Sequence, residues 1–293
     1  MSRIEVLKTY KVYIGGQFPR TESGRYHTIK SKKGEPLANV CLCSRKDVRN
    51  AVVAARKAQG AWAERAAFNR GQILYRIAEM LEGRKSQFIE ELLSLGFTQK
   101  NAQTEIDLSI ERLVYYAGWC DKYNQIISSV NPVSSAHFNF STCEPMGVIG
   151  IIADNNSPLL GLISSLAPAI AGGNTVVVLS SVDYPLNAVT FAEVLHASDV
   201  PGGVVNILTG SLHETAPTLA SHMDINAFVA SNISHEFSTS LQLNAVDNLK
   251  RFFHYTIDWN QQNSQGLHFI GDLQEVKTTW HPIEQIGGAT SSY

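Results

Sequence analysis

The stretch GVIGIIADNNSPLLGLISSLAPAIAGGNTVVVL (147–179) decides the fold. Residues 148–153 form a continuous apolar run, which is typical of a strand buried on both faces. A helix is predicted from Pro158, and residues 175–179 are a second apolar strand of the same kind. Two such strands joined by a helix form a βαβ unit, so this stretch predicts a parallel sheet.

The same alternation continues toward the C-terminus. Predicted helices cover 186–197, 213–221 and 236–246, and predicted strands cover 204–208, 225–230 and 250–257. Right-handed crossovers would place the helices on both faces of the sheet. The predicted fold class is therefore α/β, with a doubly wound, Rossmann-like parallel sheet.

The residues before this unit predict helices and a few strands. Segments 10–18 and 25–29 flank the turn-rich stretch PRTESG and are expected to form a β-hairpin. Apolar spacing predicts helices over 46–62, 66–95 and 100–123, and alternation predicts a strand over 134–143.

After Asp258 the sequence becomes rich in polar residues. WNQQNSQG (259–266) is expected to be a flexible connector. Residues 267–270 and 273–280 are expected to be extended, and 283–293 is expected to be a loose tail.

Composition excludes several classes of function. The net charge of −2 gives no electrostatic footprint for nucleic acid or an anionic membrane. No signal peptide and no apolar run of membrane-spanning length are expected. Four cysteines do not make a disulfide framework in a chain of 293 residues, so we expect a reducing, cytoplasmic setting. Cys41 and Cys43 are expected to pack in the core rather than to bind a metal.

Several motifs, taken in order, resemble the aldehyde dehydrogenase superfamily. They are EPMGVIG (144–150), LAPAIAGGNTVVV (166–178), PGGVVNILTG (201–210) and LASHMDI (219–225). YIGGQF (13–18) and DVRNAVVAARKAQGAWAE (47–64) are similar to the early strand and first long helix of the family. LQEVKTTWHP (273–282) looks like the last strand of a complete member.

The resemblance implies a domain organisation. Residues 1–258 correspond to the N-terminal and NAD(P)-binding domain, and 259–266 would replace an excised catalytic domain. An antiparallel oligomerisation flap is expected from strands near 10–29 and 134–143 together with the C-terminal strand in 267–282. The expected partners are further copies of this chain or a full-length aldehyde dehydrogenase.

The resemblance also implies that the catalytic groups are missing. The family attacks the aldehyde carbonyl with a thiolate, and the last cysteine here, Cys143, precedes the βαβ unit. Tyr255 stands where the family has its general-base Glu, and a phenol is a poor base at neutral pH. Asn156 matches the amide that stabilises the oxyanion, although we favour the simpler interpretation of an ordinary turn at a strand end.

Cofactor binding is expected to be lost as well, so NAD(P) is implied by the family alone. Leu179–Val182 replaces the motif that holds the adenosine ribose, and Ala230 and His235 replace the glycines of the pyrophosphate loop, where only Ser231 is kept. Gly203 remains, in a predicted turn. The positions expected at the degenerate crevice are Asp154, Asn155, Asn156, Leu179, Val182, Gly203, Ala230, Ser231 and His235, and no metal site is expected.

Three functions follow from these observations. The first is a non-catalytic pseudoenzyme that acts as an oligomerisation or regulatory partner. The second is an aldehyde oxidoreductase with residual or altered chemistry, and the third is a nucleotide or metabolite sensor. Altered chemistry would use Asn156, Ser157, His235, His254 and Tyr255. Phe252, Phe253, Tyr255 and Trp259 form either an exposed apolar patch or ordinary strand core.

Overall fold

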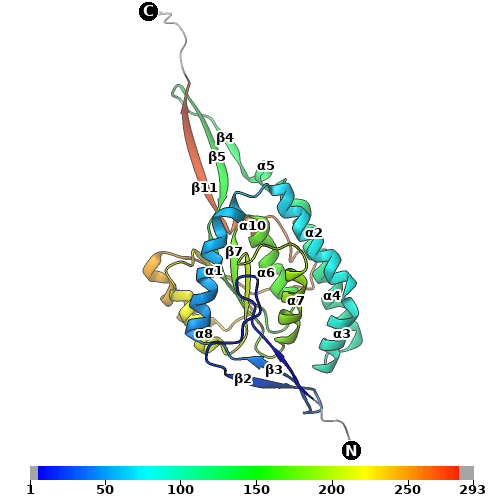
Figure 1. Ribbon diagram of the computed structural model, residues 1–293. Coiled ribbons are helices and arrows are strands. Elements are labelled where there is room, and N and C mark those ends of the chain that lie inside the picture. Colours follow the sequence, from blue (N-terminus) through cyan, green and yellow to red (C-terminus); the bar gives the residue numbers. More distant parts are fainter. Residues whose placement is uncertain (1–5, 284–293) are drawn as a thin grey trace, which may run out of the picture.

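A five-stranded parallel sheet lies at the centre of the computed structural model, which describes residues 6–283 (Figure 1). The strands are β6 (Val148–Ile152), β7 (Thr175–Leu179), β8 (Val205–Leu208), β9 (Ala227–Ser231) and β10 (Arg251–Tyr255), in the spatial order β10-β9-β6-β7-β8. The connecting helices are α6 (Leu160–Ala171), α7 (Leu186–His196), α8 (Leu212–Ser221) and α9 (His235–Ala245). The predicted doubly wound parallel sheet is confirmed.

Helices cover both faces of this sheet. Helices α6 and α7 pack on one face together with α2 (Ala67–Gly83) and α4 (Gln99–Trp119), and α1 (Arg45–Ala63) and α8 cover the other. Successive strand residues alternate between the two layers, so Ile151 and Ile152 belong to separate apolar clusters.

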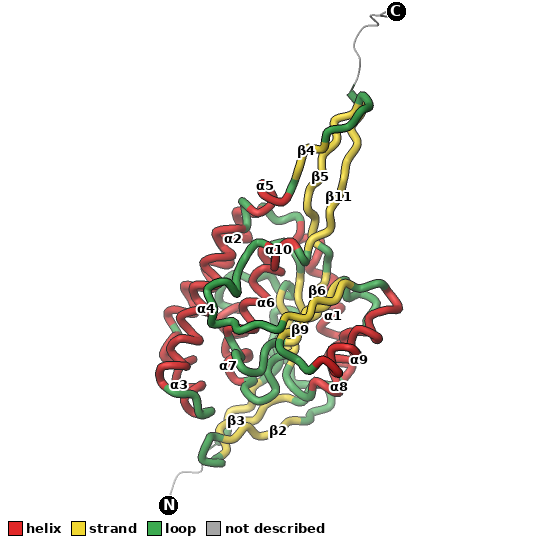
Figure 2. The backbone as a smooth tube through the Cα atoms, turned by 180° about the vertical axis from the view of Figure 1, so that it is seen from behind, coloured by secondary structure: helices red, strands yellow, loops and turns green. Residues whose placement is uncertain are grey.

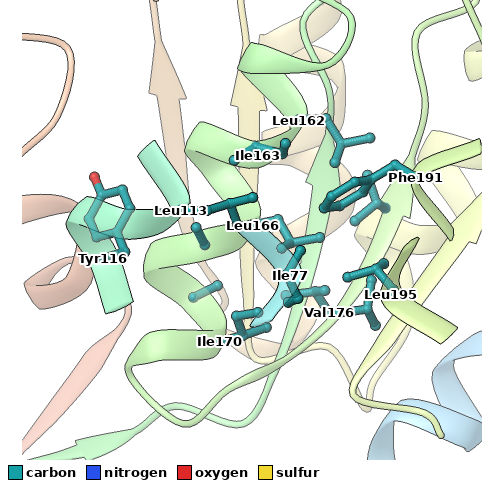
Figure 3. Packing of buried hydrophobic residues seen from close by; sticks show 14 of the residues in the cluster. Ile77, Leu113, Tyr116, Leu162, Ile163, Leu166, Ile170, Val176, Phe191 and Leu195 are labelled. Carbon is teal, nitrogen blue, oxygen red and sulfur yellow. The ribbon is translucent and has the colours of Figure 1, made fainter. Parts of the chain in front are cut away.

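Helix α6 lies at the centre of the larger apolar cluster. Every residue from Leu160 to Ala171 is buried, which explains a helix sequence without charge. Figure 3 shows Leu166 and Ile170 of α6 among Leu113, Ile77 and Val176, which come from α4, α2 and β7. Burial of each large aliphatic side chain contributes about 1.5–3 kcal/mol.

The N-terminal helical region is divided more finely than the sequence predicts. The segment 66–95 is two helices, α2 and α3 (Lys85–Ser94), which meet at Arg84. The Arg84 side chain contacts Gln87 and also Glu193 on α7, at 2.6 Å. The segment 100–123 is likewise α4 followed by the short helix α5 (Tyr123–Ile127).

The predicted hairpin of 10–18 with 25–29 is wrong. Strand β2 (Tyr26–Lys30) pairs with β3 (Pro36–Cys41), and β1 (Lys8–Tyr10) lies parallel to β3 on its other side. The chain reverses at SKKGE (31–35), where Gly34 has a φ of +82°. Tyr13 instead exchanges backbone hydrogen bonds of 3.0 and 2.8 Å with Ile207 of β8.

A second antiparallel sheet projects from the body at the opposite end from β1-β3-β2 (Figures 1 and 2). Its order is β11-β5-β4, from β4 (Ser129–Asn131), β5 (His137–Pro145) and β11 (Gln274–Pro282). We call this sheet the flap. The predicted strands 134–143 and 273–280 are confirmed and pair over the whole of β11. The grouping of 10–29 with them is wrong, because the two sheets are separate.

The segment between β10 and β11 is anchored at Trp259 and Ser264, whereas residues 260–263 are exposed, so the flexibility expected for 259–266 stays a prediction. Trp259 and Ser264 are each 1% exposed. Arg112 of α4 donates to the carbonyl oxygens of Trp259, at 3.2 Å, and Ser264. Residues 267–270, expected to be extended, lie largely in helix α10 (His268–Gly271). The predicted loose tail, 283–293, lies outside the described residues except for Ile283.

Between residues 6 and 283, none of the helices combines the length and apolar character that a membrane crossing requires.

Candidate functional site

A polar hollow of about 520 Å³ opens at the carboxyl ends of β6, β9 and β10. Strand order reverses between β6 and β9, and open α/β sheets bind ligands at this kind of switch point. We call the hollow the switch-point pocket. It is lined by Asp154, Asn156, Ser157, Asn232, Ile233, Thr256, Ile257, Asp258, Trp259 and Asn260.

Side chains connect the loops that follow β6 and β9. Asp154 accepts a hydrogen bond from the Asn232 side-chain amide at 2.6 Å and one from the Asn156 backbone N–H at 2.9 Å. The Asn232 amide also exchanges hydrogen bonds of 2.8 and 2.9 Å with the Ile257 backbone. Asn232 has a φ of +53°, a left-handed conformation that Asn tolerates better than most residues. The loops after β6, β9 and β10 are therefore tied together.

A second bridge joins the loops after β6 and β7. The Asn155 side-chain oxygen accepts from the Ser181 hydroxyl at 2.6 Å and from the Asp183 backbone N–H at 3.2 Å. The Asn155 amide also donates to the Asp183 carboxylate. Leu179 is buried at the end of β7, whereas Val182 is partly exposed beside this bridge. The Asn155 side-chain oxygen and the Ser181 hydroxyl are thus hydrogen-bonded to each other.

Asn156 is the predicted residue whose side chain faces open space. It is exposed, and it lines both the switch-point pocket and an adjoining hollow of about 310 Å³. Below it, the buried carboxylate of Glu105 on α4 accepts from the backbone N–H groups of Leu159 and Leu160 at 3.0 and 2.9 Å. Burial raises the pKa of Glu105 to about 7.

Glu105 and Asn232 were missed by sequence reasoning. Glu105 interrupts the apolar stripe of α4, between Ala102 and Ile106, and a carboxylate at a core position is a sign of a buried partner. Asn232 carried no comparable pattern in the sequence.

Tyr255 is not among the residues that line the switch-point pocket. Its hydroxyl donates to the Asp272 carboxylate at 2.7 Å, and its ring packs edge-on against Phe269 and Trp259. Burial, and secondarily Asp272, raise the pKa of Tyr255 further above its ordinary value. The sequence left open whether four aromatic residues form an exposed patch or core. Trp259 is core, and Phe252, Phe253 and Tyr255 are half-buried.

The other proposed catalytic side chains are not brought together. His235 is exposed at the first turn of α9, whereas His254 is half-buried on β10 beside Ala230. Ala230 and Ser231 are buried within β9, and the Ser231 hydroxyl lies 3.3 Å from that of Ser165. Ser157 lines the switch-point pocket, and neither histidine does.

Gly203 lies outside the switch-point pocket. It precedes β8, so it sits at the amino ends of the parallel strands, opposite the loops described above. Its φ is +96°, and a Cβ atom there would lie 2.5 Å from the carbonyl oxygen of Ala54. This glycine therefore permits the close approach of α1.

The four cysteines are buried and none lines the switch-point pocket. Cys41 and Cys43 pack in one apolar cluster, as expected. Cys143 lies on β5, which leads into the amino end of β6, whereas Asn156 follows the carboxyl end. Across the described part of the chain, no group of three or more His, Cys, Asp or Glu side chains could hold a metal ion.

Comparison with known proteins gives the family. Residues 18–252 match the model of the aldehyde dehydrogenase family. The chain belongs to this family. It is 34% identical over 248 residues to the protein DhaS of Bacillus subtilis (strain 168), which is named as an aldehyde dehydrogenase, and the match covers 83% of this chain and 49% of DhaS. It is also 34% identical to mouse cytosolic 10-formyltetrahydrofolate dehydrogenase, over 77% of this chain and 26% of that protein.

Solved aldehyde dehydrogenases share the fold. The NAD⁺ complex of the Bacillus cereus enzyme superimposes with a TM-score of 0.80 at 28% identity, over 84% of this chain and 50% of that one. PnpE from Pseudomonas sp. WBC-3 gives a TM-score of 0.80 at 27% identity, over 85% and 50%. The chain thus spans about half the length, or less, of the relatives that it matches.

Proposed function

We propose that this aldehyde dehydrogenase family chain does not oxidise aldehydes and instead acts as an assembly partner, of itself or of a full-length family member. The observation that carries the proposal is the separation of thiols from the switch-point pocket. Aldehyde oxidation needs a thiolate that reaches the carbonyl, and Asn156 has no thiol beside it.

The state of the thiols supports the same conclusion. Burial raises the pKa of Cys43, Cys120 and Cys143, which keeps these groups protonated at neutral pH. Tyr255 stands at the general-base position. Its hydroxyl donates a hydrogen bond to the Asp272 carboxylate, and its ring packs against Phe269. The switch-point pocket therefore has neither a thiolate nor the general base of the family beside Asn156.

The residues at the sheet end do not fit NAD(P). Hydrogen bonds tie Asp154 to Asn232 and Asn155 to Ser181, so these side chains are already paired with one another. The carboxylates of Asp154 and Asp183 place negative charge at this end of the sheet, which disfavours a pyrophosphate there. Bulk at Ala230 and His235 further prevents close backbone approach to phosphate.

The flap supplies the surface for assembly. Val130, Phe138, Val276 and Trp280 are each 47–66% exposed on its strands. Strand β11 pairs on one side with β5, and its other edge has no paired strand within residues 6–283. An open edge with apolar side chains favours addition of a partner strand.

Two flap substitutions test this proposal. Val276→Asp with Trp280→Ser should abolish co-purification with a full-length aldehyde dehydrogenase of the same organism, and should reduce the mass of any self-assembly. Val53→Asp is the matched control, because Val53 is similarly exposed (57%) but lies on α1. A chain that stays monomeric and captures no dehydrogenase, or a flap variant that assembles like the control, would contradict the proposal.

A sensor of small ligands is the second candidate, favoured by the switch-point pocket itself. The exposed Asn156 amide and the buried Ser157 provide hydrogen-bonding groups there. A thermal-shift comparison with NAD, NADP and AMP separates the two functions. The melting temperature of a sensor should rise when its ligand is added, whereas that of an assembly partner should fall when the protein is diluted.

A further inference from the structure

The two edges of the central sheet are treated differently. At the β8 edge, the chain's own Tyr13 exchanges two backbone hydrogen bonds with Ile207, and the Gly15 N–H donates to the Asn206 side chain. At the β10 edge, no segment between residues 6 and 283 pairs with the outer side of the strand. An uncovered edge of this kind is a template for strand pairing.

The hydrogen-bonding direction along β10 follows from its pairing with β9. The Tyr255 carbonyl accepts from the Asn232 N–H, so Tyr255 points its backbone groups toward β9. Directions alternate along a strand, so Arg251 and Phe253 also face β9, whereas Phe252 and His254 face outward. Among the described residues, the N–H and C=O groups of Phe252 and His254 have no hydrogen-bond partner.

We propose that β10 pairs antiparallel with β10 of a second copy of this chain about a two-fold axis at Phe253, which joins the two sheets into one. In this register Phe252 lies opposite His254 of the other copy, and both present outward groups, so the two positions form hydrogen-bonded pairs. Phe253 lies opposite its own copy in the non-hydrogen-bonded position. The strand is thus complementary to itself in its hydrogen-bonding pattern.

The side chains fit the same register. Arg251 would lie opposite Tyr255 of the other copy, so no two like charges face each other. The Arg251 guanidinium is already paired with Glu275 at 2.7 Å, which neutralises its charge at this edge. Phe253 and Tyr255 are half-buried with nearly parallel rings, 16° apart, and pairing would continue this aromatic row across the axis. The strand, RFFHY, contains no Lys, acidic residue or Pro, which are the residues that usually block edges.

This interface is independent of the proposed function, because β10 lies in the central sheet and the flap is a separate sheet. A failure of the flap variants leaves β10 pairing intact, and the reverse also holds. The occupant is a second copy of the chain because the complementarity is with the strand's own sequence.

Cysteine cross-linking tests the axis. Phe253→Cys should form an intermolecular disulfide under mild oxidation, since opposed non-hydrogen-bonded residues have Cα atoms about 4.5 Å apart. Phe252→Cys is the matched control: each copy of it would lie about 6.8 Å further along the strand from its counterpart, which is too far to bridge. The four native cysteines are buried and serve as an internal background.

A mixing experiment keeps Phe253 in place in case its replacement impairs folding. Chains with Phe252→Cys and chains with His254→Cys should each remain monomeric on a non-reducing gel, and their mixture should yield the cross-linked dimer. Cross-linking of Phe253→Cys and of the mixture alone would support the two-fold axis. Equal cross-linking of every variant, or none in either experiment, would overturn it.

Discussion

Glu105→Gln tests how the Asn156 loop is held. The carboxylate of Glu105 accepts hydrogen bonds from the N–H groups of Leu159 and Leu160 at the start of α6, just after Asn156 and Ser157. Burial raises the pKa of this carboxyl from 4.5 to about 7. The folded state therefore holds the proton more tightly than the unfolded state, so the free energy of unfolding should fall as pH rises between about 4.5 and 7.

The magnitude follows from the same pKa. Each pH unit across this interval corresponds to about 1.4 kcal/mol, so the loss should approach about 3 kcal/mol by neutral pH. Glutamine keeps an oxygen acceptor for the two N–H groups and carries no charge. Glu105→Gln should therefore match the wild type near pH 4.5 and be more stable by about 2–3 kcal/mol at pH 8.

Urea unfolding followed by tryptophan fluorescence, at a series of pH values, measures this difference. Glu111→Gln is the matched control, because Glu111 lies on the same helix and is exposed. The reasoning is refuted if Glu105→Gln shows the same dependence of stability on pH as the wild type, or if the control loses that dependence too.

Two further predictions concern the segment after β10 and the packing of α1 against the turn before β8. Arg112→Met removes both hydrogen bonds to the carbonyl oxygens of Trp259 and Ser264. Limited proteolysis should then cut within 256–266 faster, and the free energy of unfolding should fall by at least about 2 kcal/mol. An unchanged rate of proteolysis would contradict the anchoring of this segment by Arg112. Gly203→Ala places a Cβ 2.5 Å from the Ala54 carbonyl oxygen, so calorimetry should show a loss of more than about 1 kcal/mol, and an unchanged melting temperature would contradict the structural role of Gly203.

The sequence predicts the central sheet well because four of its strands, β6, β7, β8 and β9, are short runs buried on both faces. Residues such as Ile151 and Val177 leave no alternative to a buried strand once helices flank them. The N-terminal hairpin could not be predicted in this way. Tyr13 looks like a strand residue, but it pairs with Ile207, which is distant in the sequence. The turn-forming residues of PRTESG favour pairing of 10–18 with the segment that follows them, 25–29.

The candidate site could be predicted only in part. Asn156 was placed at the sheet end because it follows a predicted strand, and Asp154 and Asn155 came with it. Their partners could not be found from the sequence, since Asn232 and Asp183 come from loops after other strands. The anchoring of Trp259 and Ser264 could not be predicted from the polar composition of 259–266, because the buried Arg112 that bonds to them is on a different element.

The most direct test of the central claim is an aldehyde oxidation assay with the purified chain. Incubation with a broad panel of aldehydes and either NAD or NADP should produce no reduced cofactor above the rate without protein, because none of the four thiols reaches the pocket beside Asn156. Cofactor reduction that saturates with aldehyde and disappears in Cys143→Ala would contradict this account.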